Sequence, residues 1–405
     1  MSTARKPRSV DEHGQAVAAL LATTPVVRLD LAECAGLALA EPITATVPLP
    51  PFDNSAMDGY AVRSVDIAGA TASAPVALPV TEDIPAGRTD SPALQPRTAH
   101  RIMTGAPIPP GSDAVVPVEL TDGGRHHVQI YAPRSPGESV RLAGGDVVAG
   151  EEVLGAGAVL GPAQLGVAAA VGYARLPVHR PMRVLVLSTG SELVMPGTPL
   201  EHGQIYESNG TMLVAAVREA GGEAQVMHFV PDDVAALAAA LAPRLSGTDL
   251  LMTSGGVSAG AYEVVKIAMA GHGVDFGTVA MQPGAPQGVG RYRGVPVAAM
   301  PGNPVSALVS FEVFVRPALR AAMRLPVHRP RTIARLAQAL ESPAGKRQFR
   351  RGTFDPATGT VAPVGGPGSH LLAALARSNC LIDIPEAVTA LAAGEQVEVW
   401  RTSGT

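Results

Sequence analysis

Between residues 181 and 330, short apolar runs alternate with longer amphipathic stretches. The apolar runs have the length and composition of buried strands; they are Arg183–Ser188, Gln225–Val230, Asp249–Thr253 and Val295–Met300. Helical stretches lie between or after them, at Thr211–Ala220, from Asp232 or Asp233 to Leu245, and at Val305–Leu319. This alternation predicts a parallel α/β sheet.

Local signals mark the ends of these helices. Gly221 follows the first helix, and glycine is the usual left-handed stop. Asp232 or Asp233 can cap the second helix. Asn303 is a favourable N-cap for the third, and Pro304 suits the first helical position.

Three of the predicted strands end in loops rich in glycine and hydroxyl groups: Thr189–Glu192, Ser254–Ser258 and Pro301–Ser306. Ligands of parallel sheets bind outside the carboxyl ends of the strands, so we expect these loops to share one edge. Their amides and hydroxyls could hold an oxyanion, and Asn303 and Ser306 stand at a helix N-terminus. Each loop alone is more simply a tight turn or a helix cap. Together they favour a phosphate-bearing ligand.

The rest of the chain differs from this central region. A helix is predicted from Val10, and residues 49–144 show short apolar runs cut by proline and glycine, which is typical of a β-rich module. Residues 145–180 include a helix candidate at Ala163–Val171 and could rejoin residues 10–48, so that the β module is an insertion. From Arg331 onward, short strands predict a small β domain.

Composition and charge narrow the function classes. The 405 residues predict two to four domains. The net charge of −4 argues against nucleic-acid binding. Cys34 and Cys380 belong to no paired-cysteine motif. No signal peptide or membrane-spanning run is visible, so we expect a cytosolic protein with no membrane partner.

Carboxylates accompany the glycine-rich loops of the central region. Glu192 follows the first loop, Asp232 opens a helix and Glu263 follows the Ser254–Ser258 loop. Carboxylates near a phosphate site repel the phosphate unless a cation lies between them, which predicts a magnesium ion. The simpler readings are that Asp232 is a helix cap and that Glu263 lies on a solvated helix face.

Within the β-rich module, the segment Phe52–Ala61 combines acids, an amide and a hydroxyl around an Asp-Gly pair. The segments Arg101–Pro107 and Gly144–Val147 add a threonine and a further acid. By itself the first segment could be only an Asp-Gly turn.

Taken in order, these segments resemble the signature blocks of the molybdopterin molybdenumtransferase family. The blocks are Pro51–Val62, Arg101–Pro107, Gly111–Val116, Ser188–Leu193, Ser254–Gly260 and Pro301–Ala307. The resemblance implies a multidomain fold with a central parallel α/β domain similar to molybdopterin adenylyltransferases. It divides the chain into a linker domain (10–48 and 145–180), an inserted β-rich domain (49–144), the α/β domain (181–330) and a C-terminal β domain (331–405).

The same resemblance implies a cytoplasmic homodimer that inserts molybdate into adenylylated molybdopterin and releases AMP. Each site would lie between the α/β domain of one subunit and parts of the other. Polar or catalytic positions would be Asp58, Thr104, Asp146, Glu192, Asp232 and Glu263, of which the last three would hold magnesium. Phosphate- and nucleotide-binding positions would be Thr189, Gly190, Ser254, Gly255, Gly256, Ser258, Pro301, Gly302 and Asn303. Molybdate would lie near Arg350, Arg351 and Ser369.

Two departures from the family pattern matter. Gln282 and Ala285 stand where many relatives have lysines near the oxyanion, and neither can replace a point charge. The acid at Glu263 is usually an aspartate. A non-catalytic pterin-nucleotide-binding or scaffold protein of the same fold, and a molybdopterin nucleotidyltransferase, therefore stay open as alternatives.

Overall fold

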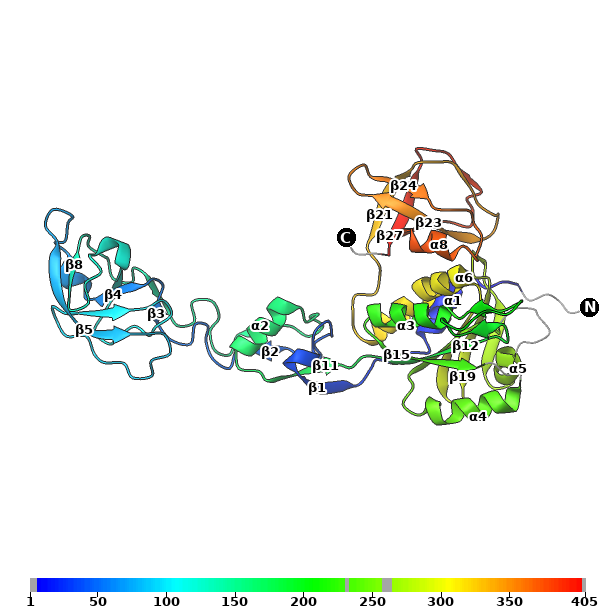
Figure 1. Ribbon diagram of the computed structural model, residues 1–405, viewed down its shortest axis with the longest axis horizontal. Helices are drawn as coiled ribbons and strands as arrows, with labels where there is room; N and C mark the ends of the chain where they lie inside the picture. Colours follow the sequence, from blue (N-terminus) through cyan, green and yellow to red (C-terminus); the bar gives the residue numbers. More distant parts are fainter. Residues whose placement is uncertain (1–5, 230–232, 257–263, 403–405) are drawn as a thin grey trace, which may run out of the picture. The chain divides into compact units, whose positions relative to one another are not determined.

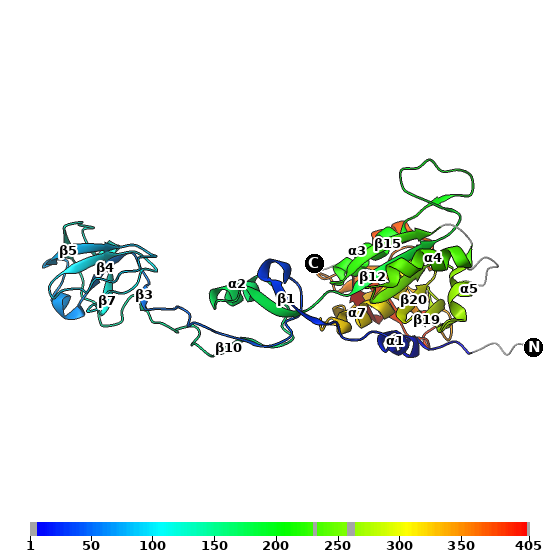
Figure 2. The ribbon, with the colours of Figure 1, turned by 90° about the horizontal axis from the view of Figure 1, so that it is seen from below.

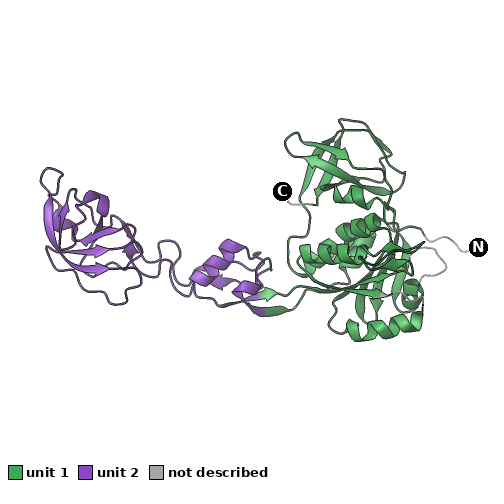
Figure 3. Ribbon diagram, viewed as in Figure 1, with its two compact units in different colours: residues 1–27, 36–38, 178–405 green, residues 28–35, 39–177 purple. Residues whose placement is uncertain are grey.

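The computed structural model describes residues 6–229, 233–256 and 264–402. The predicted site residues Asp232, Ser258 and Glu263 lie outside the described residues. The chain forms two compact units (Figure 3). Unit 1 contains the described residues of segments 1–27, 36–38 and 178–405, and unit 2 contains segments 28–35 and 39–177.

The central sheet of unit 1 is mixed, where the sequence predicted a parallel sheet. Its described strands run in the order β15 (Glu223–Phe229), β12 (Arg183–Thr189), β16 (Leu250–Ser254), β20 (Val295–Met300), β19 (Pro286–Tyr292) and β17 (Val274–Thr278). The first four are parallel, as predicted. β19 and β17, which the sequence did not predict as strands, are antiparallel and extend the sheet at one edge. Glycines at 288 and 290 interrupt the apolar pattern that would have marked β19.

Helices cover both faces of this sheet (Figures 1 and 2). They are α3 (Asn209–Glu219), α4 (Val234–Leu245), α5 (Val264–Ala270), α6 (Pro304–Ser310), the π-helical turn η4 (Phe311–Val315) and α7 (Arg316–Ala322). Val184 and Val186 of β12 pack with α3, η4 and α7. Leu185 and Leu187 pack with α4 and α5 on the other face. Successive strand residues point to opposite faces, which explains why the whole run is apolar.

The helix ends agree in part with the sequence signals. Gly221 follows α3 with a φ of +95°, and Asp233 caps α4 by accepting a hydrogen bond from the Ala236 amide at 2.7 Å. Asn303 occupies the N-cap position of α6 but makes no capping bond. The predicted continuous helix after it contains η4. Pro317 lacks the N–H that would bond residue 313, and the π turn accommodates that loss.

The helix α1 (Val10–Ala18) packs in unit 1, although the sequence-based division groups residues 10–48 with 145–180. Val10 and Val17 share a core with Phe314, and with Phe349 and Trp400 of the C-terminal region. Ser9 and Glu12 form a capping box at its start.

The C-terminal region of unit 1 is a β-barrel. Its sheet runs β18 (Met281–Gln282), β23 (Arg347–Asp355), β24 (Thr360–Pro363), β21 (Arg331–Leu336), β27 (Gln396–Arg401) and β25 (Cys380–Ile384). A further pairing of β23 with β25 closes it. β18 comes from the α/β region, so the barrel is hydrogen-bonded to that region. Short elements complete the unit: β13 (Leu193–Val194), β14 (Ile205–Tyr206), β22 (Leu340–Glu341), β26 (Ala390–Leu391) and α8 (Leu372–Ala376).

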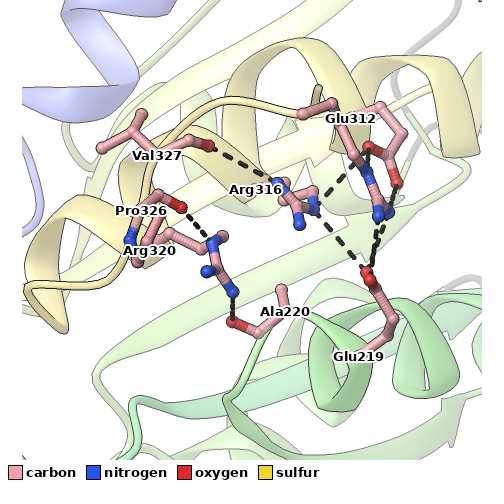
Figure 4. A network of polar contacts seen from close by, with 8 residues as sticks. Glu219, Ala220, Glu312, Arg316, Arg320, Pro326 and Val327 are labelled. Atoms are coloured by element: carbon pink, nitrogen blue, oxygen red, sulfur yellow. Dashed lines mark hydrogen bonds and ion pairs between the residues drawn. The ribbon is translucent and has the colours of Figure 1, made fainter. Parts of the chain in front are cut away.

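A partly buried ion-pair network holds the segment that leads from α7 into the barrel, with Glu312 and Arg329 largely buried and Glu219 half exposed. Arg329 donates two hydrogen bonds to Glu312, at 2.9 and 2.8 Å, and two to Glu219, both at 2.8 Å. Figure 4 shows Glu312, Arg316 and Glu219 converging from η4, α7 and the end of α3. Burial lowers the pKa of Arg316, whereas the two carboxylates raise the pKa of Arg329 despite its burial.

Unit 2 contains the predicted β module. The main sheet runs β7 (Ala114–Pro117), β4 (Gly59–Val62), β6 (Ala99–Ile102), β5 (Val76–Ile84) and β8 (His127–Ile130) around an apolar core. The remaining elements are η1 (Leu31–Glu33), β2 (Ile43–Thr44), β3 (Asn54–Ser55), η2 (Ser64–Ile67), η3 (Val118–Leu120), β9 (Val140–Arg141), β10 (Glu152–Leu154) and α2 (Pro162–Ala170). β1 (Val26–Asp30) and β11 (Arg175–His179) lie where the chain passes between the units.

Candidate functional site

A cavity of about 1060 Å³ opens at the carboxyl ends of β12, β16 and β20. The three predicted loops share this edge, as expected from the topology. The cavity wall brings together many of the residues that the sequence singled out: Thr189, Gly190, Glu192, Ser254, Gly255, Gly256, Pro301, Gly302, Asn303 and Ser369. Their roles in binding or catalysis stay predictions.

The Ser254-Gly255-Gly256 turn has a conformation that requires glycine. Gly255 and Gly256 have φ values of +95° and +69°. A Cβ atom on Gly255 would lie 2.8 Å from the Thr189 carbonyl oxygen, and one on Gly256 would lie 2.9 Å from the Val265 side chain. The turn therefore touches the neighbouring loop and helix with its backbone, and this leaves backbone groups close to the cavity.

Asn209, at the start of α3, connects two of the loops and was missed from the sequence. Its Nδ2 donates to Ser254 Oγ at 2.8 Å and to the Gly302 carbonyl at 2.6 Å. Its Oδ1 has no hydrogen-bond partner among the described residues. Asn209 stands two residues before the predicted helix Thr211–Ala220, where asparagine is a common helix cap, so its residue type alone gives no signal of a cavity.

Glu207 is a second missed residue of the cavity wall. The side chain is buried, at 3% exposure, and its Oε1 accepts hydrogen bonds from Ser188 Oγ at 3.0 Å and from the Gly210 amide at 2.6 Å. Glu207 thus connects the end of β12 to the start of α3. The segment 207–209 as a whole links all three strand-end loops.

The barrel contributes the loop around Ser369 to the cavity. Asn303 Nδ2 donates to Ser369 Oγ at 2.9 Å, and the Val305 amide donates to the Ser369 carbonyl at 3.1 Å. Arg350 and Arg351, predicted beside molybdate, are buried and do not line the cavity. Their guanidinium groups donate to carbonyls of the loop instead, Arg350 to Gly365 and Arg351 to residues 366 and 368. Burial lowers the pKa of both arginines.

The cavity wall also contains the segment that lacks the family lysines, with Gln282 and Ala285 among its lining residues. Gln282 lines the cavity and accepts a hydrogen bond from Gln348 Nε2 at 2.6 Å, where β18 pairs with β23. Lys346 directly precedes β23 and also lines the cavity. Among the described residues it is the one lysine or arginine in the cavity wall. The signal in the sequence was the rarity of lysine, because the chain has lysines only at positions 6, 266 and 346.

Of the predicted magnesium ligands, Glu192 lines the cavity. Asp232 and Glu263 are outside the described residues, and within those residues no group of three or more metal-binding side chains is present. Glu192 and Glu207 are the described carboxylates in the wall, against one cationic side chain, Lys346.

The predicted polar residues of the β module lie in unit 2. Asp58 and Thr104 contact each other: the Thr104 amide and hydroxyl both donate to Asp58 Oδ1, at 2.7 Å each. These bonds, the backbone one first, lower the pKa of Asp58. Asp146 is exposed, and its amide donates to the Leu49 carbonyl.

Comparison with known proteins decides the family. Family models match residues 8–172 ("MoeA N-terminal region (domain I and II)"), 185–321 ("Probable molybdopterin binding domain") and 333–401 ("MoeA C-terminal region (domain IV)"). Molybdopterin molybdenumtransferase 2 of Mycobacterium tuberculosis is 56% identical over 97% of this chain and 99% of its own length. The chain belongs to the molybdopterin molybdenumtransferase family. Molybdopterin molybdenumtransferase 1 of the same organism is 38% identical, over 97% of this chain and 98% of its own.

A solved structure supports the same relation. The crystal structure of a molybdopterin biosynthesis protein from Pyrococcus horikoshii is similar at a TM-score of 0.81 and 32% identity, over 99% of this chain and 100% of that one. The multidomain fold expected from the family resemblance is confirmed, and family membership makes the chain a transferase of molybdenum cofactor biosynthesis.

No helix in the described part of the chain is long and apolar enough to cross a membrane.

Proposed function

We propose that this chain inserts molybdate into adenylylated molybdopterin and releases AMP, in the cavity at the strand ends of unit 1. The observation that supports this most directly is the joining of the predicted phosphate-binding loops in one cavity of about 1060 Å³. Such a volume accommodates a large ligand that carries several phosphate groups. The amides and hydroxyls at Ser254–Gly256 and at Gly302 would bind the phosphoanhydride and orient it for cleavage.

Magnesium fits the charge of this wall. Two carboxylates and one lysine face a substrate that is itself anionic, so a cation is needed between Glu192 and the phosphate. We propose Glu192, with Asp232 and Glu263, as its ligands. The bound ion would neutralise charge on the phosphoanhydride. Glu192 would orient the magnesium ion, and the glycine-rich loops would hold the phosphate oxygens in place.

Lys346 is proposed as the cation for molybdate, in place of the lysines missing at Gln282 and Ala285. All three residues line the same wall, and the pairing of β18 with β23 brings the Lys346 turn to the Gln282 segment. Arg350 and Arg351 would act indirectly, because they hold the carbonyls of the loop that carries Ser369.

We propose that the chain forms a homodimer, in which the β module of one subunit adds polar residues to the site of the other. These residues would be Asp58, Thr104 and Asp146. The family resemblance favours a site that a second subunit completes with its β module, in a cytoplasmic enzyme. The exposed Asp58–Thr104 pair has carboxylate oxygen available to a ligand. Molar-mass measurement by light scattering tests the dimer, and a monomer at micromolar concentration would count against it.

The direct test of the proposed function is AMP release from adenylylated molybdopterin by purified protein with magnesium, with and without molybdate. Molybdate-stimulated release together with active cofactor is the expected result. Tight binding without release would favour the scaffold alternative. Formation of adenylylated molybdopterin from ATP would favour the nucleotidyltransferase.

A further inference from the structure

The amide orientation of Asn209 is fixed by its two partners. The Gly302 carbonyl can only accept a hydrogen bond, so the NH₂ group of Asn209 must face it, at 2.6 Å. The same NH₂ group lies 2.8 Å from Ser254 Oγ. Ser254 therefore accepts from Asn209, and the reverse arrangement, in which the serine donates to an amide oxygen, is excluded by the carbonyl.

This geometry determines what the Ser254 hydroxyl can do. A hydroxyl has one hydrogen to donate and an oxygen that accepts. The oxygen of Ser254 is engaged by Asn209, and its hydrogen is donated to no group among the described residues. Ser254 is otherwise buried, at 2% exposure, and lies in the cavity wall beside Gly255. Its hydroxyl hydrogen is thus available to an oxyanion in the cavity.

We propose that Asn209 is a positioning residue that keeps the Ser254 hydroxyl as a donor to the phosphoanhydride of the substrate. This inference rests on the proposed function. Charge developing on the leaving phosphate oxygens is stabilised by donors that are already oriented. Asn209 supplies that orientation from α3 and joins Ser254 to Gly302, so both strand-end loops are held together.

The test is a double-mutant cycle on molybdate-stimulated AMP release by the full chain. S254A should lower kcat on the order of a hundredfold, the usual effect of losing an oxyanion donor. N209A should lower kcat about tenfold, the equivalent of one hydrogen bond. If Asn209 acts through Ser254, adding N209A to S254A should lower kcat by well under the tenfold loss of N209A alone, the remainder reflecting the bond to Gly302. S254T, which keeps a hydroxyl, should recover part of the lost kcat.

Asn303 provides the matched control. It is a second asparagine of the cavity wall, but it bonds Ser369 and not Ser254. The losses of N303A and S254A should therefore multiply in the double variant. Circular dichroism checks that each variant folds, and N209S, whose short side chain cannot bridge both partners, replaces N209A if that variant is unfolded.

Each outcome bears on one of the two proposals. An active wild type in which the losses of N209A and S254A multiply would overturn the role of Asn209 and leave the proposed function intact. A wild type that shows no molybdate-stimulated AMP release would overturn the proposed function, and the inference with it.

Discussion

The two ends of helix α3 have opposite polar designs. Its eleven residues separate the ends by about 16 Å. At the C-terminal end, Arg329 uses Nε and both terminal nitrogens in hydrogen bonds to Glu219 and Glu312. At the N-terminal end, Asn209 Oδ1 and Glu207 Oε2 have no hydrogen-bond partner among the described residues, and both residues line the cavity.

This difference in hydrogen bonding indicates that the C-terminal end of α3 contributes to stability and its N-terminal end to ligand binding. A buried charge must be paired, because an unpaired one costs several kcal/mol. Arg329 meets that requirement within the protein. Arg316 Nε beside it has no hydrogen-bond partner among the described residues and is paired only by charge, 3.6 Å from Glu219 and 3.8 Å from Glu312. A binding site needs polar groups that the protein itself does not fully satisfy, since a ligand has to supply the missing partners. We therefore expect changes at one end of α3 to alter mainly unfolding, and changes at the other to alter mainly turnover.

The largest expected effect is on stability, from R329A. Removing the guanidinium leaves Glu312 buried, at 7% exposure, without its strongest partner. Unfolding free energy should fall by about 3–5 kcal/mol. Urea denaturation followed by circular dichroism measures it.

The matched control for that variant is R183A. Arg183 also pairs with a glutamate, Glu223, at 4.0 Å, but both side chains are more than half exposed. Its removal should cost less than about 1 kcal/mol. Equal losses for R329A and R183A would show that the network contributes no more than a surface pair.

A smaller free-energy effect, seen mainly in turnover, is expected from G255A. A Cβ at this position meets the Thr189 carbonyl oxygen and requires a strained φ, so the Ser254–Gly256 turn must move. A displacement of roughly 1 Å near the reacting groups costs on the order of a hundredfold in rate. AMP release by G255A is compared with that of G271A, whose added Cβ would have no neighbour within 4 Å. Similar rates for both variants would place the chemistry elsewhere.

The smallest effect concerns the Asp58–Thr104 pair of unit 2. T104V removes the hydroxyl donor and keeps the backbone donor, so the lowered pKa of Asp58 should rise only part of the way to its ordinary value. Because the folded-state pKa is depressed, the stability from this pair is present above the ordinary pKa. It is lost as the pH falls through the lowered one. A carboxylate titration by NMR measures the shift, and an unchanged titration in T104V would refute the hydroxyl contribution.

The pattern of apolar residues predicted those strands of unit 1 that are buried on both faces. The strands β12, β16 and β20 are covered on both faces, so their sequences are nearly continuous apolar runs. Their order in the sheet places the predicted loops at one edge. β15 forms the sheet edge, and in it the exposed residues Glu223 and Gln225 flank the buried Ala224. The antiparallel strands β17, at the sheet edge, and β19, beside it, were missed because glycines and polar residues interrupt their apolar pattern.

The residues of the candidate site were easiest to predict where they lie in the loops that end the predicted strands, above all where backbone conformation requires glycine. Gly255 and Gly256 need positive φ, and this is visible as a paired glycine. Asn209 and Lys346 act through neighbours that are distant in sequence, Ser254 and Gly302 for the first and the Gln282 segment for the second. Arg350 and Arg351 have the residue type of anion ligands. Their guanidinium groups instead donate to carbonyls of the 365–368 loop, and only the fold of the barrel brings this loop to them.

If molybdate is inserted in the unit 1 cavity with Lys346 as its cation, the molybdate dependence of AMP release must change when Lys346 is removed. Wild type, K346A, K346A/Q282K and the control K266A, whose lysine does not line the cavity, are compared across molybdate concentrations. K346A should need roughly tenfold more molybdate for half-maximal release, the equivalent of one charge-assisted hydrogen bond. Q282K should restore the wild-type dependence, and K266A should match wild type. An unchanged molybdate dependence in K346A would contradict the account.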